Sequence, residues 1–212
     1  RSTSHPEACG QKPCARKSRP MRSKLLSLCV LILALLPQIA KADPADIDAA
    51  ARGVVRVVII GTDGREVYPV SHGTGFAVAP DMIVTNAHVV AFAGQIEVQP
   101  FESSRRYPAT VTSLSMGMDL AVLEVKDKAF FEASGKGLEI NTKLPALKDA
   151  VSVYGYPVGG DALAITKGTI TRIEYDDYSE RQAGLKLEIS ASISSGNSGG
   201  PAVIDNKVVG LV

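Results

Sequence analysis

Residues 75–85 read GFAVAPDMIVT and hold two short apolar runs on either side of Pro80-Asp81. Proline fixes φ near the value that a tight turn needs, so this stretch predicts two β-strands joined by a turn. Runs of the same kind, rich in Val, Ile and Thr, surround it. They lie at 54–60, 96–99, 107–113 and 120–125. Short strands in series, without long amphipathic helices between them, indicate an all-β sandwich or barrel.

A second series of β-type runs follows a more charged stretch. Residues 126–148 contain Gly135 and Gly137 and predict a linker with one helical turn. After the linker come runs at 151–154, 165–173, 185–189, 201–204 and 208–212. Only five strands are predicted here, and the sequence stops within the last run. We therefore expect a fragment whose second half is incomplete.

The charge of the chain is unevenly divided. Residues 1–42 carry eight Lys or Arg against one Glu, whereas residues 43–212 carry fifteen against twenty-one Asp or Glu, a net charge of −6. A nucleic-acid binder would present a basic face, so this balance argues against that class of protein. All three cysteines lie in the first part, which excludes disulfides, Cys-bound zinc and a Cys nucleophile from the second.

Residues 21–42 predict a secretory signal peptide. Two basic residues precede an apolar run at 25–36, and Ala40-Lys41-Ala42 has the small-x-small pattern of a cleavage site. The run is shorter than the roughly 20 residues of a membrane span. We expect an exported protein, periplasmic or extracellular, that starts at Asp43 and keeps no membrane span after cleavage. A buried core helix or a signal anchor is the alternative.

Residues 1–20 precede this segment and are rich in Arg, Lys, Ser and Pro. We expect them to be an upstream extension, either disordered or artefactual. They contribute nothing to the predicted fold.

Two histidines, His72 and His88, are the candidates for a general base in residues 43–212. His88 lies in TNAHVV (85–90) directly after an apolar strand, where a rigid sheet can hold it over a cleft. His72 precedes Gly73-Thr74-Gly75 and is expected to be a loop side chain.

The sequence GNSGGP at 196–201 places one serine, Ser198, among glycines. Glycine allows a sharp turn that exposes the hydroxyl and lets backbone N–H groups converge, as an oxyanion hole requires. Taken alone, a Gly-Ser cluster is more often a flexible loop. A third feature is Asp119 in MDLAVLE (118–124), where an acid enters an apolar strand. A carboxylate there needs a partner, and a histidine N–H would serve.

Taken together, TNAHVV, MDLAVL and GNSGGP resemble the three signature blocks of the HtrA/Deg family of trypsin-like serine proteases. GYPVGGD (155–161) and TKGTITRIE (166–174) are similar to that family's second barrel. The resemblance implies two six-stranded β-barrels with the active site between them. The first would span 43–125, and the second, at 149–212, would be truncated at its C-terminal end.

The resemblance also implies a role for each motif residue. Ser198 would be the nucleophile, His88 the general base and Asp119 the residue that orients it, while the backbone N–H groups of Gly196, Asn197 and Ser198 would form the oxyanion hole. Ser192 and Ile193 would lie at the base of the S1 pocket, and because neither is charged we expect small aliphatic P1 side chains. The mechanism requires neither a metal nor a cofactor.

Asn197 departs from the digestive trypsins, which carry an Asp before the nucleophile to pair with a newly cut N-terminus. A neutral amide cannot be the counter-ion of a buried ammonium. We therefore expect no activation by N-terminal processing, in agreement with the HtrA/Deg pattern.

The resemblance implies an exported serine endopeptidase that degrades misfolded or damaged polypeptides through an acyl-enzyme. Its expected partners are unfolded polypeptide substrates, with no nucleic acid, and a homo-oligomer that would be a trimer by family resemblance. Two other functions stay open. One is a catalytically idle domain of the same fold that acts as a peptide-binding chaperone or scaffold. The other is an esterase that uses the same triad.

Overall fold

The computed structural model describes residues 49–179 and 182–212. The predicted extension at 1–20 and the predicted signal peptide at 21–42 lie outside the described residues. Residues 49–52 are helical and lead into the first strand. In the described ranges, none of the helices has both the length and the apolar character needed to cross a membrane.

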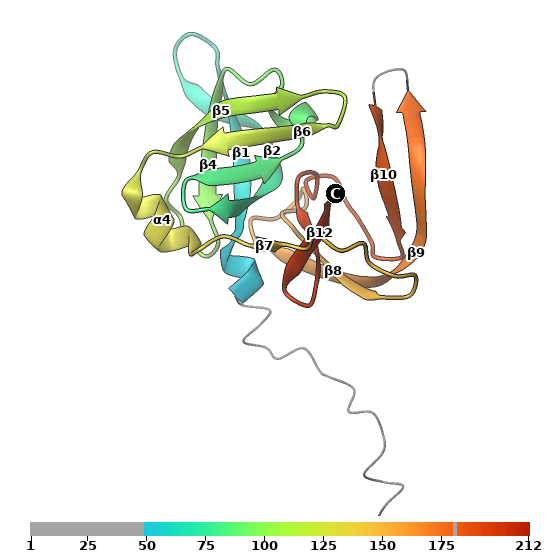
Figure 1. Ribbon diagram of the computed structural model, residues 1–212. Helices are drawn as coiled ribbons and strands as arrows, with labels where there is room; N and C mark the ends of the chain where they lie inside the picture. The colour runs from blue at the N-terminus through green and yellow to red at the C-terminus, as the bar shows by residue number, and fades with distance from the viewer. Residues whose placement is uncertain (1–48, 180–181) are drawn as a thin grey trace, which may run out of the picture. The chain divides into compact units, whose positions relative to one another are not determined.

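Six antiparallel strands close into a barrel in the order β1-β2-β3-β6-β5-β4 (Figure 1). They are β1 (Val54–Thr62), β2 (Val67–Ala79), β3 (Met82–Thr85), β4 (Gln95–Pro100), β5 (Tyr107–Ser115) and β6 (Leu120–Glu124). Alternate residues of a strand point to opposite faces. In β1, Val55, Val57 and Ile59 therefore enter the barrel core, where they join the fully buried Ile83 and Leu123.

The second half forms a six-stranded sheet in the order β10-β9-β8-β11-β12-β7. Its strands are β7 (Glu139–Ile140), β8 (Ala150–Gly155), β9 (Ala164–Ser179), β10 (Gln182–Ile189), β11 (Pro201–Ile204) and β12 (Lys207–Leu211). The sheet curls around a core that includes Val151, Val153 and Ile170, and its edges are β10 and β7. The β9–β10 hairpin stands out from the sheet in orange in Figure 1.

A third cluster of buried side chains joins the two halves. Val54 of β1 and Phe76 of β2 come from the barrel, while Tyr154, Tyr156 and Val203 come from the sheet. Their residual exposure is 5% or less. Because β1 has buried residues on both faces, it reads as a nearly continuous apolar run, and the burial holds the sheet against the barrel.

The predicted fold class, all-β with a trypsin-like pair of barrels, is confirmed. The first barrel is closed, and the second is a curled, six-stranded half-barrel. Two strands, β3 and β11, have the predicted bounds.

Two local predictions were wrong. The linker supplies a sixth strand to the second sheet, β7, whose two residues pair in parallel with β12 and are too few to show a pattern. The helix predicted in the linker is present and is longer than one turn: α4 (Lys128–Ser134) has seven residues and is capped by the Asp127 side chain. His72 belongs to β2, opposite Val58 of β1, and not to a loop. The start of β2 is exposed and contains Pro69, and this concealed that strand.

Candidate active site

The pairing of β3 with β6 brings His88 and Asp119 together. Thr85, the last residue of β3, lies opposite Ala121 of β6. The chain leaves β3 into a one-turn helix, α3 (Ala87–Val90), that carries His88. Asp119 lies just before β6 begins. Two neighbouring antiparallel strands therefore place the two residues side by side, although 31 positions separate them.

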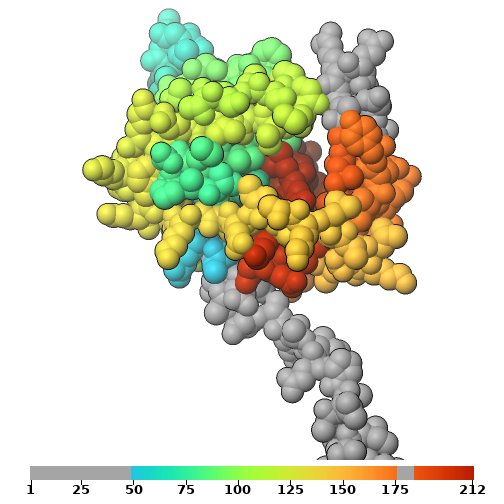
Figure 2. Space-filling view, in the orientation of Figure 1, coloured from blue at the N-terminus to red at the C-terminus, as the bar shows by residue number. Residues whose placement is uncertain are grey.

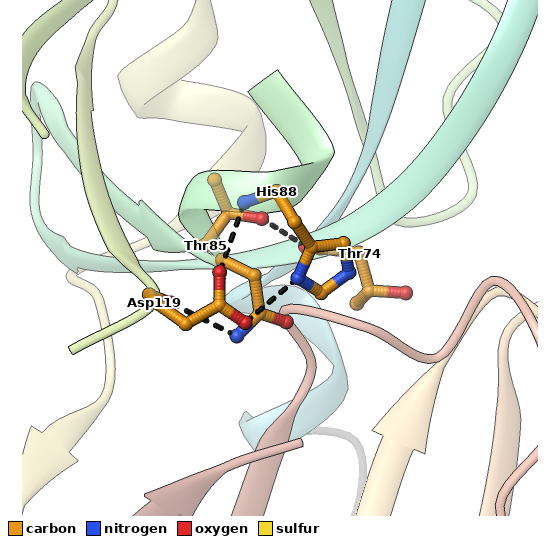
Figure 3. Close-up of polar contacts among 5 residues, drawn as sticks. Thr74, Thr85, His88 and Asp119 are labelled. Atoms are coloured by element: carbon orange, nitrogen blue, oxygen red, sulfur yellow. Dashed lines mark hydrogen bonds and ion pairs between the residues drawn. The ribbon is translucent and has the colours of Figure 1, made fainter. Parts of the chain in front are cut away.

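The Asp119 carboxylate binds His88 through both of its oxygens, as Figure 3 shows. The His88 backbone N–H donates to Oδ1 at 2.9 Å, and ring Nδ1 lies 2.7 Å from Oδ2. An ionised carboxylate only accepts hydrogen bonds, so Nδ1 carries the proton. In the neutral imidazole this leaves Nε2 as a lone-pair acceptor. His88 is 53% exposed and Asp119 25%, so the ring can reach a substrate.

Asp119 adopts a left-handed backbone conformation, with φ +49°. Among non-glycine residues, Asp and Asn are the ones that tolerate this region best. The Asp119 N–H donates to the Met116 carbonyl at 3.4 Å, which closes the turn ahead of β6. The Asp119 carbonyl accepts from the side chain of Asn86 at 3.1 Å. Backbone and side-chain contacts together thus direct the carboxylate at His88.

The loop that carries Ser198 is held in place by hydrogen bonds that its carbonyl groups accept. Each carbonyl from residue 195 to residue 198 has a donor: the N–H of Val158 at 2.7 Å, the hydroxyl of Thr74 at 2.7 Å, the N–H of Gly200 at 2.8 Å and the N–H of Thr74 at 2.8 Å, in that order. Gly196 and Gly199 have φ of +95° and +86°, which only glycine adopts without strain. The loop conformation is therefore set at every peptide.

In a trans peptide the carbonyl and the following N–H point in opposite directions. Because the Ser195 and Asn197 carbonyls turn toward the protein, the N–H groups of Gly196 and Ser198 turn away from it. In the described part of the chain, neither of these two N–H groups has a hydrogen-bond acceptor. They are the pair of donors that could bind an oxyanion.

Asn197 differs from the prediction that it contributes a third donor. Its N–H donates to the Ser194 carbonyl at 3.0 Å, because the Thr74 hydroxyl holds the Gly196 carbonyl on the opposite side. The Asn197 side chain is 3% exposed and lies against Gly155, where a Cβ would come within 2.6 Å of Oδ1. Asn197 therefore packs the loop onto the sheet.

The Ser198 loop and the residue after His88 meet at Gly73 of β2. A Cβ at Gly73 would lie 2.9 Å from Val89, the neighbour of His88, and 3.2 Å from the Ser198 carbonyl. Within residues 49–179 and 182–212, no hydrogen bond joins the Ser198 hydroxyl to the His88 ring. Such contacts between a nucleophile and its base are often long in the absence of substrate.

A cavity of about 500 Å³ opens between the barrel and the sheet. Asp119 and Met118 line it from the barrel, and residues of β10 and β12 line it from the sheet. Figure 2 shows the hollow between the yellow-green atoms of the barrel and the orange atoms of β9 and β10, with red C-terminal residues at its base. Ile193 lines this cavity, whereas Ser192 is exposed and is not part of the lining.

The other histidine, His72, lies where the barrel meets the loop after β8. Its Nε2 is 3.2 Å from the Tyr156 carbonyl. Burial lowers the pKa of His72, and the nearby Arg56 guanidinium lowers it further. Arg56 forms an ion pair with Asp161. Burial also raises the pKa of the Tyr156 phenol to about 12.

Sequence reasoning missed two polar residues of the site, Thr74 and Asn86. Thr74 is fully buried, and Asn86 is 6% exposed. Their signals were present, since Thr74 stands between two glycines and Asn86 lies within TNAHVV. In the described residues, no three side chains among His, Cys, Asp and Glu gather as ligands for a metal ion.

Comparison with known proteins places this geometry in a family. Residues 73–211 match the family model described as the trypsin-like peptidase domain. The chain belongs to the trypsin-like peptidase family. The matched range includes His88, Asp119 and Ser198, and it covers more than half of the chain.

The relatives of this trypsin-like peptidase are proteases of the Do and DegP type, which confirms the HtrA/Deg resemblance. It is 37% identical over 175 residues to "Protease Do-like 4, mitochondrial" of Arabidopsis thaliana, covering 79% of this chain and 33% of that protein. It is 36% identical over 140 residues to "Serine protease DegP homolog" of Plasmodium falciparum (isolate 3D7), covering 66% of this chain and 16% of that protein. The chain thus spans a third or less of the length of these relatives.

A solved structure supports the same assignment. The active form of the Rv3671c protease from M. tuberculosis superposes with a TM-score of 0.65 at 25% sequence identity. The match covers 96% of this chain and 83% of that one. It therefore includes both the closed barrel and the second sheet.

Proposed function

We propose that the protein is a serine endopeptidase of the HtrA/Deg type that degrades misfolded or damaged polypeptides through an acyl-enzyme. The observation that carries the proposal is the direct contact of Asp119 with His88, next to a serine loop in which two N–H groups have no acceptor among the described residues. Family membership supports the reaction type. The names of the relatives support polypeptides as the substrate class.

The steps follow from the tautomer of His88. Ser198 Oγ attacks the scissile carbonyl carbon while Nε2 of His88 takes the hydroxyl proton, and Asp119 stabilises the imidazolium that forms. The carbonyl oxygen becomes an oxyanion that accepts from the N–H groups of Gly196 and Ser198. His88 then gives the proton to the leaving amine. Water repeats the sequence on the acyl-enzyme and frees Ser198.

Export belongs to the same proposal, with residues 21–42 as the signal peptide, and so does assembly into a trimer. One relative is named as mitochondrial, and an organelle is therefore the competing destination. Fractionation of cells that express the tagged full-length protein separates the two. Recovery in the periplasm or medium supports export, and recovery in an organelle contradicts it.

A second candidate is an idle domain of the same fold that binds peptides as a chaperone or scaffold. Among the described residues, no hydrogen bond joins the Ser198 hydroxyl to the His88 ring, and a site in which this contact also failed to form with substrate would be idle.

The test uses the full-length protein with unfolded casein and a serine-directed phosphonate. For an endopeptidase, both cleavage and labelling are expected, and Ser198→Ala should lower kcat by on the order of 10³ to 10⁶. The control is Ser113→Ala, which changes an exposed serine on β5 and should leave turnover unchanged. Casein binding without cleavage or labelling would support the idle domain. Ester hydrolysis without casein cleavage would support an esterase.

A further inference from the structure

Thr74 of β2 is a polar connection between the two halves of the molecule. It is fully buried, and each of its hydrogen-bonding groups is occupied. Its hydroxyl donates to the Gly196 carbonyl at 2.7 Å and accepts from the Tyr156 N–H at 2.9 Å. Its backbone N–H donates to the Ser198 carbonyl at 2.8 Å. One residue of the first barrel therefore holds two carbonyls of the nucleophile loop, 122 positions away from Gly196.

Thr74 is itself held from within its own barrel. Its carbonyl accepts from the Thr85 hydroxyl at 2.7 Å, and Figure 3 shows this contact beside the His88 and Asp119 pair. Thr85 is also fully buried and ends the strand that leads to His88. The end of β3 therefore positions both His88, which follows it in the chain, and Thr74, which its Thr85 hydroxyl contacts.

The hydroxyl of Thr74 decides the direction of one peptide in the nucleophile loop. The Gly196 carbonyl points at that hydroxyl, so the Asn197 N–H points away and closes the turn onto Ser194. Without a donor at Thr74, the Gly196 carbonyl would be buried and unpaired, which is unfavourable. Rotation of this peptide would relieve the penalty. The Gly196 N–H, one of the two proposed oxyanion donors, belongs to the preceding peptide, and we expect it to be displaced through the shared Gly196 Cα.

The nucleophile loop approaches β2 and β3 closely at two glycines. A Cβ at Gly199 would come within 2.0 Å of the Thr74 carbonyl and 2.3 Å of the Thr85 hydroxyl. A Cβ at Gly200 would lie 3.3 Å from the Thr74 methyl group. The loop backbone therefore packs directly on Thr74.

We propose that Thr74 is a positioning residue of the hydrolytic reaction. Its buried hydroxyl links the oxyanion-binding loop of the second half to the strands of the first barrel that lead to His88. The inference rests on the proposed function. It adds that productive oxyanion geometry exists only when barrel and sheet are docked through Thr74. Thr74 acts through Gly196 and Ser198 and has no contact with the reacting atoms.

The test compares Thr74→Val, which keeps the shape and loses the hydroxyl, with Thr74→Ser, which keeps the hydroxyl, in the full-length protein. Loss of one oxyanion donor costs about 10² to 10³ in kcat, and a donor that is only misdirected should cost less. We expect Thr74→Val to lower kcat by about 10- to 100-fold with little change in KM. Thr74→Ser should restore kcat to within about threefold of wild type.

Affinity for a peptide aldehyde separates positioning from a general loss of stability. The aldehyde forms a tetrahedral adduct with serine that uses the oxyanion hole, so its affinity should fall by the same factor as kcat/KM. The matched control is Ser134→Ala in α4, which also deletes a buried hydroxyl that donates to a carbonyl. It should leave both measurements unchanged at a temperature where the protein is folded.

Hydrogen exchange measures the stability of the loop directly and does not depend on catalytic activity. The N–H groups of Asn197 and Gly200 are hydrogen-bonded within the loop, and the Gly199 N–H donates to the Val212 carbonyl at 2.8 Å. Peptides covering 194–200 should exchange about tenfold faster in Thr74→Val and at the wild-type rate in Ser134→Ala. If Thr74→Val does not fold, Thr74→Cys replaces it, because a thiol is a weak donor of similar size, and the same losses are expected.

Each result decides the inference. A folded Thr74→Val protein (or Thr74→Cys in its place) with wild-type kcat, aldehyde affinity and exchange would overturn it, as would equal losses in Ser134→Ala. An inactive wild-type protein would refute the proposed function, and the exchange rates would then decide the role of Thr74 alone. Exchange at 194–200 that is unchanged in Thr74→Val would refute that role.

Discussion

The two halves of the molecule build their parts of the site in different ways. In the closed barrel, every strand has two neighbours, and the pairing of β3 with β6 delivers His88 directly to Asp119. The second sheet has two edges and carries Ser198 on a loop with two left-handed glycines. That loop receives hydrogen bonds from the other half, through Thr74. The base and acid are thus a local product of one sheet, whereas the nucleophile loop depends on docking.

This difference implies that substitutions in the two parts of the site should affect activity and stability differently. A change in the barrel pair should abolish proton transfer and leave the fold intact. A change at the contact between the halves should lower stability and activity together.

The largest expected effect comes from Asp119→Asn. The amide oxygen can still accept from the His88 backbone N–H, but the amide NH₂ would then face ring Nδ1 and donate to it. The imidazole proton would move to Nε2, which could no longer accept from Ser198. We expect kcat to fall by about 10³- to 10⁴-fold with little change in the midpoint of thermal unfolding.

The control for this change is Asp127→Asn, which alters the cap of α4 but keeps a good capping side chain. It should leave kcat unchanged. Casein hydrolysis and thermal unfolding of both variants decide the question. An Asp119→Asn protein with more than about a tenth of wild-type turnover would separate the His88 contact from catalysis.

The next effect concerns the contact between the halves. Gly199→Ala would bring a Cβ within 2.0 Å of the Thr74 carbonyl, at a φ of +86°. Gly64 in the β1–β2 turn has nearly the same φ, +87°, but open space around it. We expect Gly64→Ala to cost about 1 kcal/mol of unfolding free energy from backbone strain alone, and Gly199→Ala to cost about 3 kcal/mol or more.

Urea unfolding of the two glycine variants measures this difference. Because both positions share the same backbone strain, the excess cost at Gly199 reports the close approach of loop and strand. Equal costs would show that the second half can move away from β2 without penalty, and the docking argument would then fail.

The smallest effect is a pH dependence of stability that arises from His72 at the same contact. Burial and Arg56 lower its pKa in the folded state, so as pH falls below about 6.5 the unfolded chain binds a proton first. Stability should therefore fall as the pH drops from about 6.5 through the lowered pKa, and His72→Gln should remove this part of the dependence. The charged groups nearby are Arg56 and Asp161, which are paired with each other.

The measurement is urea unfolding of wild type and His72→Gln at several values between about pH 5 and pH 7.5. Carboxylates titrate in both proteins, so only the difference between the two curves belongs to His72. Parallel curves would mean that His72 is as accessible to protons in the folded chain as in the unfolded one.

The strands that could be predicted are those with an alternating or continuous apolar pattern between turn residues. Met82–Thr85 and Pro201–Ile204 are examples, and both have the predicted bounds. The beginning of β2 was missed because it is exposed and contains Pro69, and β7 because two residues carry no period. Tertiary pairing, with β1 and with β12, makes these segments strands.

The sequence by itself determined the chemistry of the site. The types and local settings of His88, Asp119 and Ser198 predicted a base, an acid and an exposed hydroxyl, because a strand end and a pair of flanking glycines are properties of a few consecutive residues. The number of usable N–H donors is different. It depends on which way each peptide faces, and therefore on which partner its carbonyl finds. Only the tertiary structure decided that the Asn197 N–H is used within the loop and that the Thr74 hydroxyl binds the Gly196 carbonyl, because Thr74 and the loop come together from distant parts of the chain.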